Sequence, residues 1–267
     1  MNEKVSRANA ATARAVTVTR VNPAHWRATA ENLLVGQADV SERPDGRSFI
    51  SVDAWSDAAF DRLADRMLAD LNGPLYTVVD DTDPALLAKW KQHGLQPRRR
   101  EREYRVPTSD DPVRETLASP PAGVTLVTFG MADETRLREL DRDIRREVDA
   151  TSGWSSMPAE VLPGPNGRAV IDPSRYAVAV RDGRYIGLVR VAGRASQPRI
   201  GLLAVRADEQ RSGVGRILLA LALHAVHERG VDAVCTEVDE TNTIAIRLLD
   251  RFGAQHTGSA WELERSR

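Results

Sequence analysis

The sequence predicts an α/β fold in which a central mixed β-sheet is flanked by helices, and it predicts two tandem copies of this arrangement. An apolar segment, residues 200–205, precedes a glycine-rich turn and an apolar-periodic segment at 217–228, which is the order strand, turn, helix. Residues 176–180 and 185–189 alternate on either side of an Asp-Gly pair, which is a strong hairpin signal. Part of the strand–helix pattern also occurs earlier in the chain.

That earlier occurrence predicts an internal duplication. Strand-like and helix-like segments alternate over residues 47–94, and an offset of 159 residues places Asp83 on Asn242 and Gly94 on Gly253. The first copy carries the segment Asp53–Asp57 where the second has its glycine-rich turn, and it lacks room for the β-hairpin. We therefore expect a degenerate, truncated first copy without a phosphate site.

Composition limits the domain number and the class of protein. A chain of 267 residues with 42% hydrophobic residues can form one large or two modest domains. The formal net charge of −1 provides no overall field for nucleic acid or an anionic membrane. No stretch approaches the roughly 20 apolar residues of a membrane span. The single Cys235 cannot form an internal disulfide, which fits a cytoplasmic location.

Turn-forming residues suggest where the domains begin and end. Residues 1–14 contain no apolar core of a secretory signal and are expected to form a flexible tail. The first domain is then predicted at 15–107 and the second at 123–267. Between them, 108–122 is rich in Pro, Ser and Asp and is interpreted as a linker.

The glycine-rich turn has the composition of an anion site. Gly213 and Gly215 remove side chains where the helix begins, so consecutive backbone N–H groups can face one anionic group. The helix start adds roughly half a positive charge. No Gly-Lys-Ser/Thr follows, which excludes a Walker loop, and two glycines do not make a dinucleotide fingerprint. The turn is therefore predicted to hold a pyrophosphate.

Two motifs in this order resemble the GNAT N-acetyltransferase superfamily. Residues 210–215, Gln-Arg-Ser-Gly-Val-Gly, match the acetyl-CoA loop pattern Gln/Arg-x-x-Gly-x-Gly/Ala. Asn242 to Ala245, followed by Leu248 and Leu249, resembles the later Asn-x-x-Ala…Leu-Tyr segment. The resemblance implies a tandem GNAT protein with an intact second domain and acetyl-CoA as the donor.

The resemblance also implies which residues hold acetyl-CoA. Backbone atoms of Leu203, Ala204 and Val205 would pair with the pantetheine arm, and one N–H group there would polarise the acetyl carbonyl. The pyrophosphate would lie on the loop made by Gln210, Arg211, Ser212, Gly213, Val214, Gly215 and Arg216. Asn242 would form a hydrogen bond with the cofactor near its pantetheine. The alternative is an ordinary strand–helix connection.

The catalytic groups are less well defined. Glu237 lies in an otherwise apolar strand beside the expected acetyl position, where burial could raise its pKa, and it is the candidate general base. A carboxylate paired with an Arg is the alternative. The family often has a Tyr general acid where this chain has Leu249, so water, Tyr176 or Tyr185 would have to replace it.

Acceptor recognition is expected from the least regular part of the second domain. Trp154 and Asp149 could stack on and pair with a cationic amine, although Trp154 could equally cover the core. His224 and His227 lie away from the apolar stripe of their helix, so a solvated face is favoured over a metal site.

These observations predict an N-acetyltransferase that moves an acetyl group from acetyl-CoA to an amine of an unidentified acceptor. A small molecule is favoured over a peptide or protein amine, and the alternative is a non-catalytic acyl-CoA-binding or scaffold protein. The Arg-rich segment 98–105 is interleaved with Glu, which fits a strand with one charged face and not a nucleic-acid site. A monomer or a homodimer is expected.

Overall fold

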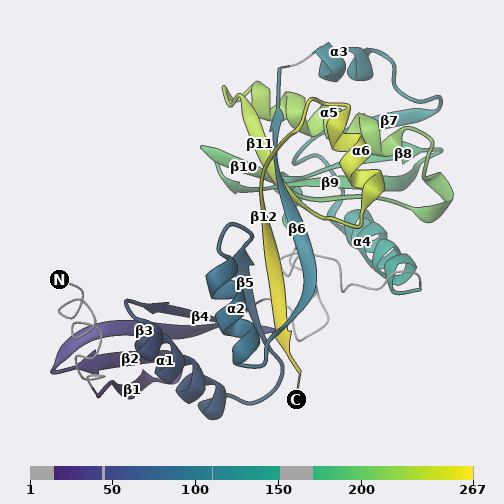
Figure 1. Cartoon of the computed structure of the whole chain (residues 1–267). Coiled ribbons are helices and arrows are strands. Elements are labelled where there is room, and N and C mark those ends of the chain that lie inside the picture. The colour runs from purple at the N-terminus through teal and green to yellow at the C-terminus, as the bar shows by residue number, and fades with distance from the viewer. Residues whose placement is uncertain (1–14, 44–45, 110, 151–170, 267) are drawn as a thin grey trace, which may run out of the picture. The chain divides into compact units, whose positions relative to one another are not determined.

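The computed structural model describes residues 15–43, 46–109, 111–150 and 171–266. It is a mixed α/β structure with helices flanking β-sheet, as the sequence predicts (Figure 1). The chain divides into two compact units. The first comprises Met1–Arg98 together with Glu262–Arg267, and the second comprises Arg99–Trp261.

The first unit is a sheet with two helices. Its elements are β1 (Thr17–Asn22), β2 (His25–Ala30), β3 (Leu33–Glu42), β4 (Ser48–Ala54), α1 (Asp57–Asp70), β5 (Leu75–Asp80) and α2 (Pro84–Gln92), and the strand order is β1-β2-β3-β4-β5, followed by β12 (Gln255–Arg265). Helix α1 buries Phe60, Leu63 and Met67, which recur every three or four residues and so lie on one face.

The antiparallel pairs β1–β2 and β2–β3 correct one expectation, because the first copy does have room for a β-hairpin. The turn between β2 and β3 is made by Glu31 and Asn32, which adopt φ values of 50° and 64°. Sequence analysis missed this turn because neither residue is glycine, the usual signal for positive φ in a tight hairpin.

The second unit contains the larger part of the structure. Its elements are β6 (Gln96–Pro107), α3 (Asp111–Ala118), β7 (Val124–Val127), α4 (Glu134–Asp149), β8 (Tyr176–Arg181), β9 (Arg184–Arg194), β10 (Gln197–Val205), α5 (Val214–His227), β11 (Ala233–Asp239) and α6 (Thr243–Asp250), and the strand order is β12-β6-β11-β10-β9-β8-β7. Strands β6 and β12 each contribute residues to both units.

The division between the units differs from the expected boundaries. The predicted linker at 108–122 contains helix α3, whose Val113 and Thr116 are buried, and Val113 belongs to the same apolar core as α5. Asp and Pro are common in the first turn of a helix, and here Asp111 and Pro112 begin one. Residues that suggested an irregular linker therefore form a packed helix.

The internal duplication is confirmed in detail. Strand β5, helix α2 and strand β6 recur as β11, α6 and β12 at the predicted offset of 159 residues. In each copy, a threonine hydroxyl bridges to the neighbouring strand: Thr77 donates to the Ile50 carbonyl at 2.9 Å, and Thr236 donates to the Ile200 carbonyl at 3.1 Å. Both copies therefore share hydrogen bonds as well as element order.

The two repeats exchange their last strands. Strand β6, which ends the first repeat, pairs antiparallel with β11 of the second repeat. Strand β12, which ends the second repeat, lies between β5 and β6 in the sheet order. A chain cut between the repeats would therefore leave each of them without the strand that the other repeat contributes to the sheet.

Two apolar cores cover the two faces of the sheet in the second unit. One is built around α5 and includes Val106 of β6, Val234 of β11 and Leu249 of α6. The other is built around α4 and includes Leu137, Leu140 and several residues of β8 and β9. Hereafter they are called the α5 core and the α4 core, and they fix which way each side chain of β10 and β11 points.

Candidate functional site

A gap in the sheet opens between the parallel strands β10 and β11. Their register consists of one pair, Arg199 with Cys235. Beyond that pair, the segments Ile200–Val205 and Thr236–Asp239 are not partners of each other, although the Thr236 hydroxyl still reaches the Ile200 carbonyl. One edge of each strand is therefore left for another hydrogen-bonding chain.

A β-bulge in β10 turns the backbone toward this gap. The register between β9 and β10 shifts between Ile200 and Leu202, which makes Gly201 an extra residue. Ile200 packs in the α5 core and Leu202 in the α4 core, although a regular strand would place residues two apart on the same face. Beyond the bulge, Leu203 and Val205 contact the α5 core and Ala204 contacts the α4 core.

The backbone groups of Leu203 and Val205 face the gap. The N–H of Arg206 donates to the carbonyl of Ile186 on β9 at 3.0 Å. In an antiparallel ladder, alternate residues turn their hydrogen-bonding groups toward the partner strand, so Leu203 and Val205 turn theirs away from β9. The Val205 carbonyl accepts from the Gln210 amide at 3.2 Å. The N–H groups of both residues are left to meet an extended ligand.

The start of α5 is open to an anion. Gly213 is the N-cap residue, has a φ of 87° and makes no side-chain capping bond. Arg211 also has a positive φ of 60°. The first backbone bond of the helix is from the Ile217 N–H to the Gly213 carbonyl at 3.1 Å. Within the described part of the chain, the N–H groups of residues 213–216 donate to no protein acceptor, so they can bind a phosphate group.

Acidic groups around this loop are neutralised by arginines. The pairs are Arg206 with Asp143 at 2.8 Å, Arg184 with Asp208 at 2.8 Å, and Arg181 with Glu209. The hydrogen bond from Arg206 holds the pKa of the Asp143 carboxyl below its usual value. Arg211 and Arg216 are exposed, and neither pairs with a carboxylate among the described residues. The loop is therefore locally positive.

Asn242 has a structural task that the sequence analysis did not identify. It is the N-cap of α6, and its Oδ1 accepts a hydrogen bond from the Ala245 N–H at 3.1 Å. That bond uses the oxygen and leaves the amide nitrogen as the group that can donate to a ligand. The predicted hydrogen bond to the cofactor is compatible with this geometry and stays a prediction.

Leu249, which stands where the family often has a Tyr general acid, is buried. Its side chain is 5% exposed and belongs to the α5 core. Its neighbour Leu248 is half-buried and lies close to the start of α5, since a Cβ built on Gly215 would be 3.9 Å from Leu248 Cδ2. The position equivalent to Leu249 in the first copy is Trp90, which is also buried.

Glu237 forms an ion pair with an arginine, which is the alternative that the sequence analysis left open. Its Oε2 lies 2.5 Å from Nη1 of Arg199. The flanking Thr236 and Val238 face α5, so Glu237 points to the opposite side of the sheet, and Glu103 lies beside it on β6. It therefore stands at the gap, but its role as a general base stays a prediction.

The two candidate replacement acids are buried in the α4 core. The Tyr185 hydroxyl accepts a hydrogen bond from the Asp133 N–H at 3.1 Å, at the start of α4. Burial raises the pKa of the Tyr176 hydroxyl, and 4% of that residue is exposed. Both residues contribute to packing, and neither is shown to reach the gap.

Of the two residues predicted to bind the acceptor, the structure describes the position of Asp149. Asp149 is the last residue of α4. Trp154 lies outside the described residues. His224 is exposed, whereas His227 is half-buried, 3.5 Å from the Thr108 hydroxyl. Among the described residues, no group of three or more His, Cys, Asp or Glu side chains is arranged to hold a metal ion.

None of the described helices is long and apolar enough to cross a bilayer.

The Arg-rich segment forms strand β6, as predicted, and several of its arginines pair with carboxylates, including Arg100 with Glu240 at 3.1 Å.

Strand β10, the start of α5 and Asn242 all lie in a segment that matches a known protein family. Residues 136–254 match the model of the acetyltransferase (GNAT) family. This part of the chain is therefore similar to the GNAT acetyltransferases. The match includes strand β10, the glycine turn before α5 and Asn242, and it therefore covers both of the sequence motifs.

Several curated proteins similar to this chain carry the name mycothiol acetyltransferase. A mycothiol acetyltransferase of Thermomonospora curvata is 31% identical over 155 residues, which are 57% of this chain and 50% of the relative. A mycothiol acetyltransferase of Tsukamurella paurometabola is 29% identical over 173 residues, covering 60% of this chain and 57% of the relative. The chain thus spans about half the length of the curated relatives it matches.

Solved structures support the tandem fold along nearly the whole chain. A GCN5-related N-acetyltransferase from Sphaerobacter thermophilus aligns with a TM-score of 0.65 and 19% identity, covering 99% of this chain and 85% of the other. A tandem GNAT protein from the clavulanic acid biosynthesis pathway aligns with a TM-score of 0.63 and 17% identity, covering 92% and 84%. At these identities the likeness concerns the fold.

Proposed function

We propose that this chain is an N-acetyltransferase that uses acetyl-CoA as donor and a small-molecule amine as acceptor. The observation that carries the proposal is the combination of an open helix start at α5 with an unpaired strand edge at Leu203 and Val205. A pyrophosphate fits the first feature, and an amide-containing arm fits the second. Both lie on one strand–loop–helix connection.

The protein groups fit the needs of acetyl transfer. The amide bond forms between the acceptor nitrogen and the acetyl carbon, the carbon–sulfur bond breaks, and the thiolate leaves. The Leu203 N–H would donate to the acetyl oxygen, where negative charge develops in the transition state. Glu237 would take the proton that the amine loses, directly or through water. Its neighbour Arg199 would keep the carboxylate oriented.

The non-catalytic alternative also has an observation in its favour. Position 249 provides no general acid, because it is a leucine, and its side chain is buried in the α5 core. An acyl-CoA-binding or scaffold protein would need the donor site alone. Release of the CoA thiol in the presence of an amine separates the two functions, since a binding protein would take up acetyl-CoA without turning it over.

The experiment is an assay of thiol release from acetyl-CoA with a panel of amines, accompanied by calorimetric titration of acetyl-CoA. The relatives' name suggests including small molecules related to mycothiol in the panel. We expect one tight acetyl-CoA site per chain and turnover with at least one small amine. Binding without turnover across the panel would support the scaffold function, and no binding would overturn the proposal.

A matched pair of glycine variants tests the donor site directly. Gly213→Asp would place a carboxylate at the open helix start, and repulsion plus lost N–H contacts should weaken acetyl-CoA binding at least about 100-fold, or 2.7 kcal/mol. Gly73→Asp has a similar positive φ, 94° against 87°, with nothing within 4 Å of an added Cβ. It should carry comparable backbone strain and leave binding unchanged.

A further inference from the structure

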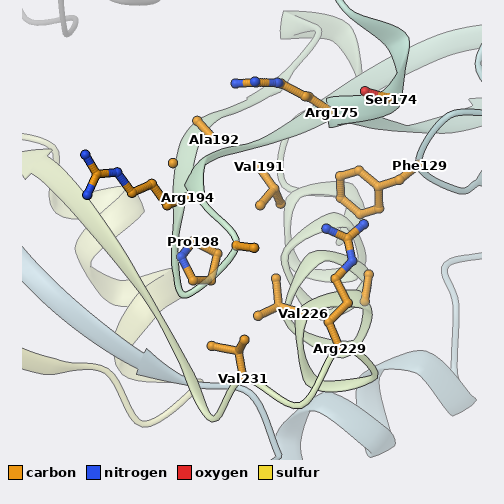
Figure 2. A pocket seen from close by; sticks show the side chains of 13 residues that line it. Phe129, Ser174, Arg175, Val191, Ala192, Arg194, Pro198, Val226, Arg229 and Val231 are labelled. Carbon is orange, nitrogen blue, oxygen red and sulfur yellow. The ribbon is translucent and has the colours of Figure 1, made fainter.

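A second hollow in the second unit lies away from the gap between β10 and β11. It encloses about 340 Å³ and is bounded by the end of the β9–β10 hairpin, the C-terminal end of α5 and the turn that carries Phe129 (Figure 2). Small-molecule sites typically enclose about 300–1,000 Å³. This volume suits a small ligand and is at the low end for a large one.

The hollow is remote from the proposed donor site. Helix α5 begins at Val214, beside the glycine loop, and contributes Val226 to the hollow. Twelve residues of α-helix separate these two positions, which is about 18 Å along the axis. Strand β10 likewise lines the hollow with Pro198 and reaches the gap with Val205 at its other end. A ligand in one site therefore leaves the other open.

The floor of the hollow is apolar. Figure 2 shows side chains from β9, β10, α5 and the loop after α5 around one space. These side chains are Val191, Pro198, Val226 and Val231, with Phe129 at one side. Pro198 and Val226 are buried, and Phe129 is half-buried. Such a floor favours the hydrocarbon or aromatic part of a ligand.

The rim of the hollow is positively charged. Arg175, Arg194 and Arg229 line it, and no Asp or Glu is among the lining residues. Arg175 is partly compensated by Asp172, 3.3 Å away. Arg194 and Arg229 lie on opposite sides of the floor in Figure 2, and within the described residues neither forms an ion pair with a carboxylate.

Carbonyl groups at the end of α5, which border this rim, already accept hydrogen bonds from the backbone. The Val226 carbonyl accepts from the N–H groups of Arg229 and Val231 at 3.1 and 3.4 Å. The His227 carbonyl accepts from the Gly230 N–H at 2.7 Å. These bonds reduce the repulsion that a helix C-terminus would otherwise exert on a negative group.

We propose that this hollow is a second ligand site that binds a small amphiphilic carboxylate. The apolar body lies on the floor formed by Val191 and Val226, and the carboxylate lies at the rim, where Arg194 or Arg229 can pair with it. Guanidinium–carboxylate hydrogen bonds are charge-assisted and stronger than neutral ones. The site goes beyond acetyl transfer, because neither its position nor its charge is required for binding the donor.

The test compares two probes of the same shape, phenylacetate and its neutral amide phenylacetamide. Each is titrated into the full-length, isotope-labelled protein and followed by nuclear magnetic resonance. We expect phenylacetate to shift the backbone amides of Val191, Val226 and Val231, and to bind at least fivefold more tightly than phenylacetamide. The double variant Arg194→Gln/Arg229→Gln should lose this preference. Arg114→Gln, an exposed arginine on α3 outside the hollow, should keep it.

Equal binding of acid and amide, or shifts confined to residues 206–213, would overturn the proposal. This comparison uses the unaltered protein, so it decides the matter even if the double variant fails to fold. Ala225→Phe gives a second readout, because a larger side chain on α5 would fill the hollow and abolish the shifts. Acetyl-CoA titrated into the same sample reports on the donor site separately, so the two proposals can fail independently.

Discussion

The two repeats share a strand–helix–strand–helix–strand order, but their first helices differ in how the N-terminus is capped. In the first repeat, two residues join β4 to α1, and the Ser56 side chain caps the helix by accepting from the Ala59 N–H at 3.2 Å. In the second repeat, residues 206–213 join β10 to α5, and Gly213 offers no side chain. When a side chain already accepts from the N–H groups of the first helical turn, fewer of these donors are left for a ligand.

The same comparison extends to the other parts of the site. Position 78 of the first repeat, a valine, corresponds to Glu237, and Asp83 corresponds to Asn242. The first repeat also joins β1 to β2 by a tight turn, whereas α4 lies between β7 and β8 in the second. Shared backbone architecture therefore does not carry the chemistry, which depends on the few positions where the repeats differ.

The largest expected effect is at the Glu237 position. If Glu237 is the base, Glu237→Gln should lower turnover by about 10²–10⁴ and leave acetyl-CoA affinity unchanged, because a positioned base contributes that much to rate. The acidic limb of the pH–rate profile should change as well. Val78→Glu, the equivalent change in the first repeat, should alter neither.

Arg199→Gln is the matched control, since it breaks the same ion pair and keeps the carboxylate. A loss of turnover as large as that in Glu237→Gln, accompanied in both variants by an equal loss of folding stability, would show that the pair is structural. A fall of less than about threefold in Glu237→Gln, with an unchanged pH profile, would also remove the base from the mechanism.

The cap residues of α2 and α6 allow a sharper test of the comparison. Asp83→Ala and Asn242→Ala each remove an N-cap bond and should each cost about 1 kcal/mol of stability. Only the second change should weaken acetyl-CoA binding. Asn242→Asp keeps the capping oxygen but loses the donor nitrogen, so we expect preserved stability with about tenfold weaker binding in calorimetry.

Removing the N-cap side chain of α1 tests whether an uncapped helix start is sufficient to bind acetyl-CoA. Ser56→Ala should lower the free energy of unfolding by about 1 kcal/mol. Calorimetry should still find a single acetyl-CoA site, because the first repeat lacks both the glycine turn and the arginines of the loop. A second site in this variant would contradict our reading of the difference between the repeats.

The smallest effect concerns α4, which has no counterpart in the first repeat. The Arg206 hydrogen bond lowers the pKa of Asp143 below the reference value of 3.8. A lowered folded-state pKa gives stability that is present above 3.8 and is lost as the pH falls through the folded-state value. Asp143→Asn should therefore be less stable than the parent at neutral pH, and urea unfolding should show the difference shrinking at the lowest pH. A difference independent of pH would exclude this ion pair as its cause.

Local sequence patterns predicted much of this structure. The glycine turn before α5 and the Asp182-Gly183 hairpin each depend on residues close together in the chain, whose backbone preferences act locally, and the 159-residue offset follows from the repetition of such local patterns. The β2–β3 hairpin was missed because Glu31 and Asn32 are less typical of a tight turn at positive φ. Helix α3 was missed because Asp and Pro occur both in linkers and in the first turn of a helix, and only packing against the α5 core distinguishes the two.

The sequence by itself determined the repeat, the strand–turn–helix order and the glycine turn before α5, because glycine at positive φ and periodic apolar residues leave few local choices. Tertiary structure decided which side chains meet. The bulge at Gly201 reversed the faces of β10, the α5 core buried Leu249, and Arg199 came to lie beside Glu237. Such contacts join residues far apart in the chain, and their geometry depends on how whole elements pack.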